Sequence, residues 1–168
     1  APAAHRDGTG LKPEGIDIDV SQFLRAAGSN AGADLQQAAA LYRGPLLDGL
    51  MVREAAFQEW IGTERVRFVE LGVGVLTRLG KALARDGDEG GALRAFRAAL
   101  DIDRLADDAH AALMQFHLDH GRQALVARHY ADCVRLYRQE FDTSPGGEID
   151  RIAREAAVRQ DSQQVEII

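Results

Sequence analysis

Histidine and cysteine side chains gather in the second half of the chain, at spacings that could support metal binding or nucleophilic catalysis. His117 and His120 are three residues apart, and His129 and Cys133 are four apart, so each pair would share one face of a helix. Four histidines, His110, His117, His120 and His129, are candidate metal ligands, but metal binding is disfavoured because Cys133 is the only cysteine and no second ligand pair has the spacing of a zinc site. We therefore expect no metal site.

A nucleophile formed by Cys133 and His129 would need an activated thiolate and a third group that orients the base. The position of Cys133 in the repeat described below instead favours a buried thiol that packs between helices. The segment 86–91 superficially resembles a calcium loop but lacks the remaining ligands and the closing glutamate. Gly90-Gly91 is not followed by the Gly-Lys-Ser/Thr of a phosphate loop. The sequence thus predicts a protein that is not an enzyme and uses no cofactor.

Composition and charge narrow the class of protein. A chain of 168 residues with 46% hydrophobic and 27% charged residues is typical of one globular domain. The net charge of −6 lacks the basic surplus that drives nucleic-acid affinity. No apolar run approaches the ~20 residues of a membrane span, and no stretch has the layout of a signal peptide. Together with the single cysteine, these features predict a cytoplasmic location.

Apolar residues recur at three- and four-residue steps along most of the chain, which predicts six to eight helices and an all-α fold. The longest stripe runs from about Glu54 to Arg85, where Gly62, Gly72 and Gly74 indicate either a kink or the close approach of another helix. Other helices are expected to begin near these residues: Asp19, Asp34, Asp88, Asp107, Leu125 and Pro145, the last at the first helical position. A short strand near Ile16 is the alternative at the start.

The second half of the chain carries a 34-residue period. Gly87 and Gly121 are 34 residues apart, as are Phe96 and Tyr130. This period predicts tetratricopeptide-like antiparallel helix pairs stacked in an α-α superhelix. The residues expected to pack between the helices are Leu76, Leu79, Gly80, Leu83, Ala92, Phe96, Ala99, Leu113, Tyr130 and Cys133. His110 and His117 occupy aromatic positions of the pattern, and Arg104 replaces its closing proline. The alternative is a helical bundle with a coincidental spacing.

One compact segment, LYRGPLLDGL at residues 41–50, interrupts the helical pattern. With the downstream Phe57-x2-Trp60-Ile61-x2-Glu64-Arg65, it resembles the bacterial transcriptional activator domain. The residues that carry the resemblance are Tyr42, Gly44, Pro45, Leu47, Gly49, Phe57, Trp60, Glu64 and Arg65. We expect the segment to be an architectural plug that packs near Phe57 and Trp60, at the start of the long helix.

The resemblance covers about residues 16–155 and implies three tandem helix pairs and a role in transcription regulation. It divides the chain into a lead-in or remnant of an upstream winged-helix domain (1–15), the helical domain (16–158) and a tail (159–168). It also implies protein partners, through self-association as a homodimer or through the transcription machinery, whereas DNA would be bound only by a domain absent from this chain. A generic peptide-binding adaptor of the tetratricopeptide type is the alternative.

Overall fold

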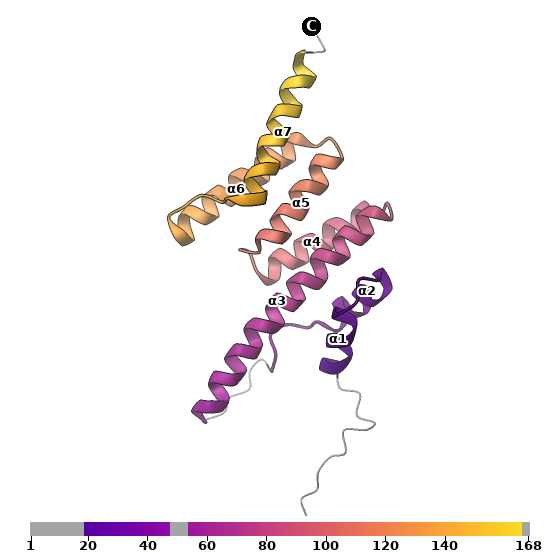
Figure 1. Cartoon of the computed structure of the whole chain (residues 1–168), viewed down its shortest axis with the longest axis vertical. Helices are drawn as coiled ribbons and strands as arrows, with labels where there is room; N and C mark the ends of the chain where they lie inside the picture. Colours follow the sequence, from indigo (N-terminus) through magenta and orange to yellow (C-terminus); the bar gives the residue numbers. More distant parts are fainter. Residues whose placement is uncertain (1–18, 48–53, 166–168) are drawn as a thin grey trace, which may run out of the picture.

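The computed structural model describes residues 19–47 and 54–165, with side chains to residue 162. In these residues every regular element is a helix, which confirms the predicted all-α fold (Figure 1). The helices are α1 (Asp19–Ala27), α2 (Gly32–Leu41), α3 (Ala55–Arg85), α4 (Glu89–Ile102), α5 (Asp107–Asp119), α6 (Gln123–Phe141) and α7 (Gly147–Val165). The strand considered near Ile16, and Gly49 of the loop motif, lie outside the described residues.

The helices form three tandem antiparallel pairs, α1–α2, α3–α4 and α5–α6, followed by α7 (Figure 1). The α1–α2 pair packs on α3, while α7 packs on both helices of the third pair. Ile149, Ile152 and Ala156 of α7 are buried against α5 and α6, so α7 closes that end of the stack. The N-terminal half of α3 extends beyond the remaining helices (Figure 1).

The 34-residue repeat is visible in the turns that join the helices. Gly87 and Gly121 both adopt left-handed backbone conformations, with φ of 83° and 66°. The amide of Asp88 donates to the carbonyl of Leu83, and 34 residues later the amide of Arg122 donates to the carbonyl of His117. Because the same backbone hydrogen bond recurs at the same period, the repeat is structural and the coincidental-bundle alternative is wrong.

The long helix α3 is continuous from Ala55 to Arg85, so its glycines do not kink it. A Cβ atom on Gly72 would lie 2.6 Å from the ring of Tyr42, whereas one on Gly74 would meet nothing within 4 Å. The close-approach alternative therefore holds at Gly72. The group that approaches is the ring of Tyr42, the residue directly after α2, which packs against Gly72 of α3.

Three predicted helix starts are shifted by two residues, and one of them is that of α6, which begins at Gln123 rather than near Leu125. Helix α7 begins at Gly147 rather than at Pro145, because Pro145 is buried and Gly147 has a φ of 54°, which interrupts a right-handed helix at that point. Helix α2 begins at Gly32 after Ala31, so Asp34 lies in the first turn and is not the N-cap. Its negative charge still lies near the helix N-terminus, where the helix dipole favours it.

Candidate interaction groove

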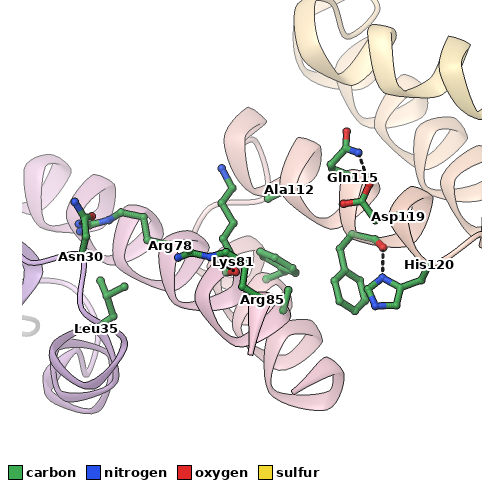
Figure 2. A pocket seen from close by; sticks show the side chains of 12 residues that line it. Asn30, Leu35, Arg78, Lys81, Arg85, Ala112, Gln115, Asp119 and His120 are labelled. Carbon is green, nitrogen blue, oxygen red and sulfur yellow. Dashed lines mark hydrogen bonds between the residues drawn. The ribbon is translucent and has the colours of Figure 1, made fainter. Parts of the chain in front are cut away.

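A groove with a volume of about 740 Å³ opens between the α1–α2 turn, α3 and α5 (Figure 2). Its apolar lining includes Leu35, Phe96 and Phe116, whose bodies belong to the hydrophobic core. The two phenylalanine rings contact each other with centroids 6.0 Å apart. The inner surface of the groove is therefore rigid and aromatic, because it is the exposed edge of close-packed core residues.

The α3 wall of the groove carries positive charge. Lys81 and Arg85 are one helical turn apart, and both side chains are exposed (Figure 2). Within the described part of the chain, neither forms an ion pair; Arg85 Nε only donates to the carbonyl of Lys81, at 3.3 Å. These two cations are thus available to a bound group.

The α5 wall is polar, and its groups bind one another (Figure 2). Gln115 Nε2 donates to Asp119 Oδ1 at 2.7 Å, and Gln115 Oε1 accepts from Arg151 of α7 at 3.3 Å. His120 Nδ1 lies 2.7 Å from the carbonyl oxygen of Phe116. Because these polar groups already have hydrogen-bond partners, the α5 wall presents fixed polar groups to an occupant rather than a free charge.

Arg78, at the edge of the groove, has a structural role that the sequence did not indicate. Its Nη1 donates to the carbonyl of Ser29 at 2.8 Å and to Asn30 Oδ1 at 3.0 Å, and its Nη2 donates to the carbonyl of Ala27. These carbonyls lie at and just after the C-terminus of α1, where helical partners are lacking. Arg78 thus fixes the first helix pair onto α3 and shapes one end of the groove.

The described part of the loop motif packs on the middle of α3. Arg65 Nε donates to the carbonyl of Leu46 at 2.9 Å, and Arg65 Nη2 donates to that of Leu47 at 2.7 Å. Tyr42 packs on Phe23, with ring centroids 5.9 Å apart, as well as on Gly72. The described contacts of the loop thus lie at Arg65 and Gly72, and the expected packing near Phe57 and Trp60 stays a prediction.

Two left-handed residues shape that loop. Gly44 has a φ of 128°, and Leu47 has a φ of 51°, which a branched side chain adopts rarely. The Arg65 hydrogen bond to the Leu47 carbonyl offsets that backbone cost. Glu64, the other charged residue of the motif, pairs with Arg67 on the same helix.

Phe57 and Trp60 form a surface pair on the projecting half of α3. Their ring centroids are 5.4 Å apart, and Trp60 is 51% exposed. Val66, further along the same half, is 60% exposed. These residues contribute to no described core cluster.

The residues expected at the repeat positions lie between the helices. Leu79, Gly80, Ala92, Phe96, Ala99, Leu113 and Cys133 are buried, while Leu76, Leu83 and Tyr130 are partly buried. The hydroxyl of Tyr130 donates to Asp150 Oδ1 at 2.6 Å, which ties α6 to α7. That hydrogen bond to a carboxylate raises the pKa of Tyr130.

Cys133 and His129 do not form an activated nucleophile. Burial raises the pKa of the Cys133 thiol to about 12 and lowers the pKa of His129 to about 4. At neutral pH the pair is a thiol beside a neutral imidazole, whereas the nucleophile is the thiolate. The packing interpretation of Cys133 accounts for its 1% exposure.

Stacked antiparallel helix pairs with a 34-residue repeat and a groove along the stack define a helical-repeat protein of the tetratricopeptide type. The family model of the bacterial transcriptional activator domain matches residues 19–156, most of the chain, and the chain belongs to that family. No curated protein and no solved structure gives a significant match. Among the described helices, none has the length and apolar character that crossing a membrane requires.

Proposed function

We propose that this chain is a non-catalytic protein-interaction module of a transcription regulator, and that its groove binds an acidic, amphipathic segment of a protein partner. The observation that carries the proposal is the pairing of an aromatic floor with a cationic wall in one groove. A floor made by Phe96 and Phe116 favours an apolar face on the occupant, because burying that face removes it from water.

The positive charge of the α3 wall indicates that the bound segment carries negative charge. Lys81 and Arg85 line the groove and form no ion pair among the described residues, whereas Arg78 donates its hydrogen bonds to the end of α1. A helical or extended segment with carboxylates along one edge and apolar residues along the other would satisfy both features. Such complementarity mainly sets specificity and the rate of association.

The family to which the chain belongs supports transcription regulation over a generic adaptor. Self-association is the competing use of the same surface, because a chain with a net charge of −6 carries acidic segments of its own. We favour a separate partner because the groove is bordered by residues of three different helix pairs, a concave shape that accepts a single segment more readily than an identical rigid copy.

Fluorescence anisotropy with a labelled helical peptide rich in Leu and Glu tests the proposal. We expect saturable binding that weakens with salt, and a loss of at least tenfold in affinity in the double variant Lys81→Glu with Arg85→Glu. The matched control is Arg94→Glu with Arg97→Glu, which makes the same charge change at exposed positions of α4 outside the groove. A peptide with Lys in place of Glu should bind more weakly.

Two results would count against the proposal. Equal weakening by the two double variants would mean that only overall charge matters. Sedimentation velocity that shows a dimer of the wild-type chain, dissociated by the α3 double variant alone, would assign the groove to a second copy instead.

A further inference from the structure

Three metal-ligand side chains from two helices meet inside the third helix pair. His110 comes from α5, while His129 and Cys133 come from α6, four residues apart on one face. The ligand atoms that they offer all lie within 4.8 Å of one another. His110 Nδ1 and His129 Nε2 are 2.9 Å apart. This cluster lies outside the groove, so its chemistry is independent of the proposed function.

The ring of His110 is oriented as a metal ligand requires. Its Nε2 lies 2.8 Å from the carbonyl oxygen of Arg104. A carbonyl oxygen only accepts, so Nε2 carries the proton and the lone pair of Nδ1 faces His129. Metal-bound histidines typically donate their second ring N–H to a carbonyl or a carboxylate in this way, which fixes both the tautomer and the ring plane.

The segment that supplies this carbonyl is itself held in place. Arg104 forms an ion pair with Glu140, near the C-terminal end of α6. Arg104, whose carbonyl orients His110, is therefore tied by this ion pair to α6, the helix that provides His129 and Cys133. Cys133 is 1% exposed and His110 is 7% exposed, so these two groups are shielded from bulk water.

His129 gives the cluster an opening to solvent. It is partly exposed and lines an open cavity of about 520 Å³, together with Asp101 and Asp132. Such an opening provides the entry path that a metal site needs. It also leaves room for water at a fourth coordination position, beside three protein ligands.

We propose that His110 Nδ1, His129 Nε2 and Cys133 Sγ bind a zinc-type transition-metal ion that joins α5 to α6. Two imidazoles and one thiolate match the nitrogen and sulfur ligands that Zn²⁺ prefers. Zn–N bonds of about 2.0–2.1 Å in a tetrahedral site place two nitrogens roughly 3.3 Å apart. The two rings would therefore separate by a few tenths of an ångström, which the partly exposed His129 side chain accommodates.

Binding exchanges one set of contacts for another. The hydrogen bond between the two histidines is replaced by two metal–nitrogen bonds. His129 keeps its single proton but carries it on Nδ1, and the Cys133 proton is released to solvent as the thiolate binds the cation. The ion then links α5 to α6 in the folded state alone, so it stabilises the third helix pair against unfolding.

The first test uses the whole wild-type chain after removal of metal by a chelator. Zn²⁺ titrated against a chromophoric competitor should bind at one ion per chain and raise the melting temperature with increasing concentration. Co²⁺ in its place should produce the near-ultraviolet charge-transfer absorption of a cobalt–thiolate bond. The proposal fails if zinc does not bind stoichiometrically, or if bound cobalt shows no thiolate absorption.

Variants then assign the ligands. His129→Gln and Cys133→Ser should each weaken Zn²⁺ binding at least tenfold, and Cys133→Ser should abolish the cobalt–thiolate absorption. His120→Gln is the matched control, since it removes a histidine outside the cluster and should leave affinity unchanged. Undiminished binding by His129→Gln, or an equal loss in His120→Gln, would overturn the assignment. Circular dichroism of each metal-free variant establishes that it is folded, and the wild-type cobalt spectrum decides the question without any substitution.

Discussion

The ring of Phe96 occupies the space that a side chain on Gly80 would need. A Cβ atom at position 80 would lie 2.5 Å from Cε1 of Phe96, and Phe96 is only 1% exposed. The absence of a side chain on α3 therefore sets how closely α4 approaches it. The aromatic floor of the groove depends on the same contact, because Phe96 also lines the groove.

Gly80→Ala should destabilise the domain by about 1–3 kcal/mol, since the added methyl group would overpack the close contact between α3 and the buried ring of Phe96. Gly74→Ala, on the same helix, is the matched control, because a Cβ there meets nothing within 4 Å. It should instead stabilise the domain by up to about 1 kcal/mol through helix propensity. Urea unfolding of the two variants measures both effects, and a stabilised Gly80→Ala variant would contradict the packing argument.

Arg65→Lys should cost about 1–2 kcal/mol of unfolding free energy, because a lysine cannot donate from two fixed directions to the carbonyls of Leu46 and Leu47. Amide hydrogen exchange in α2 should become faster, since the chain that leaves this helix would lose its anchor on α3. Arg67→Lys controls for the substitution itself, as Arg67 is exposed and its ion-pair partner among the described residues is Glu64 of the same helix. Equal stability of the two variants would show that the loop is held by packing alone.

Arg78→Ala should lower the unfolding free energy by about 2–3 kcal/mol, because it leaves carbonyls at the end of α1 without their charged donor. Lys81→Ala, one turn away and exposed, should change stability by no more than about 0.5 kcal/mol. Lys81→Ala should nevertheless weaken binding of the acidic peptide. Chemical denaturation measures the stability of the two variants, and fluorescence anisotropy measures their affinity for the peptide. Together they distinguish the structural role of Arg78 from the binding role of Lys81.

Glu89 follows the turn at Gly87, and it pairs with Arg122, which follows the equivalent turn at Gly121. The contribution of Glu89 to the stability of the fold should depend on pH. Glu89 Oε2 accepts from Arg122 Nη2 at 2.6 Å, and this hydrogen bond holds the pKa of Glu89 below its usual value of 4.5. A carboxyl group with a lowered pKa in the folded state stabilises that state above the unfolded-state pKa. The contribution is lost as pH falls through the lower, folded-state value.

Wild type should therefore melt above Glu89→Gln at neutral pH. The difference should begin to shrink below pH 4.5 and vanish once the pH has fallen through the lower, folded-state pKa of Glu89. Glu59→Gln, at an exposed position of α3 without an ion pair in the described structure, serves as the control. Scanning calorimetry across the acid range measures the melting temperatures. A pH-independent difference would assign the effect of Glu89 to packing or helix capping.

The helices and their repeat could be predicted because they rest on local signals. Apolar periodicity, the glycines at 87 and 121, and the small residue at 80 opposite the large one at 96 are all readable along the chain. Start positions such as Gly147 could not be predicted as well, because the burial of Pro145 decides them through tertiary contacts.

The contacts that shape the candidate sites join residues far apart in the sequence, so they could not be predicted from local sequence patterns. Arg78 reaches acceptors 48 to 51 residues away, and nothing in its local pattern separates it from a surface arginine. The expectation of no metal site counted His110 among the candidate histidines but assigned it to an aromatic position of the repeat. His110 lies 19 residues before His129 and meets His129 and Cys133 only when α5 packs on α6. Long-range geometry of this kind follows from the fold.

Because α3 is one unbroken helix, it fixes the distance between the groups at its two ends. Trp60 and Arg85 are 25 residues apart on one helix, which at a rise of about 1.5 Å per residue sets their separation along the axis at roughly 37 Å. The exposed aromatic end and the cationic groove wall are thus held at a fixed spacing, with no hinge between them. Any assembly that touches both ends must match that length, and a displacement imposed at one end reaches the other as a rigid rotation.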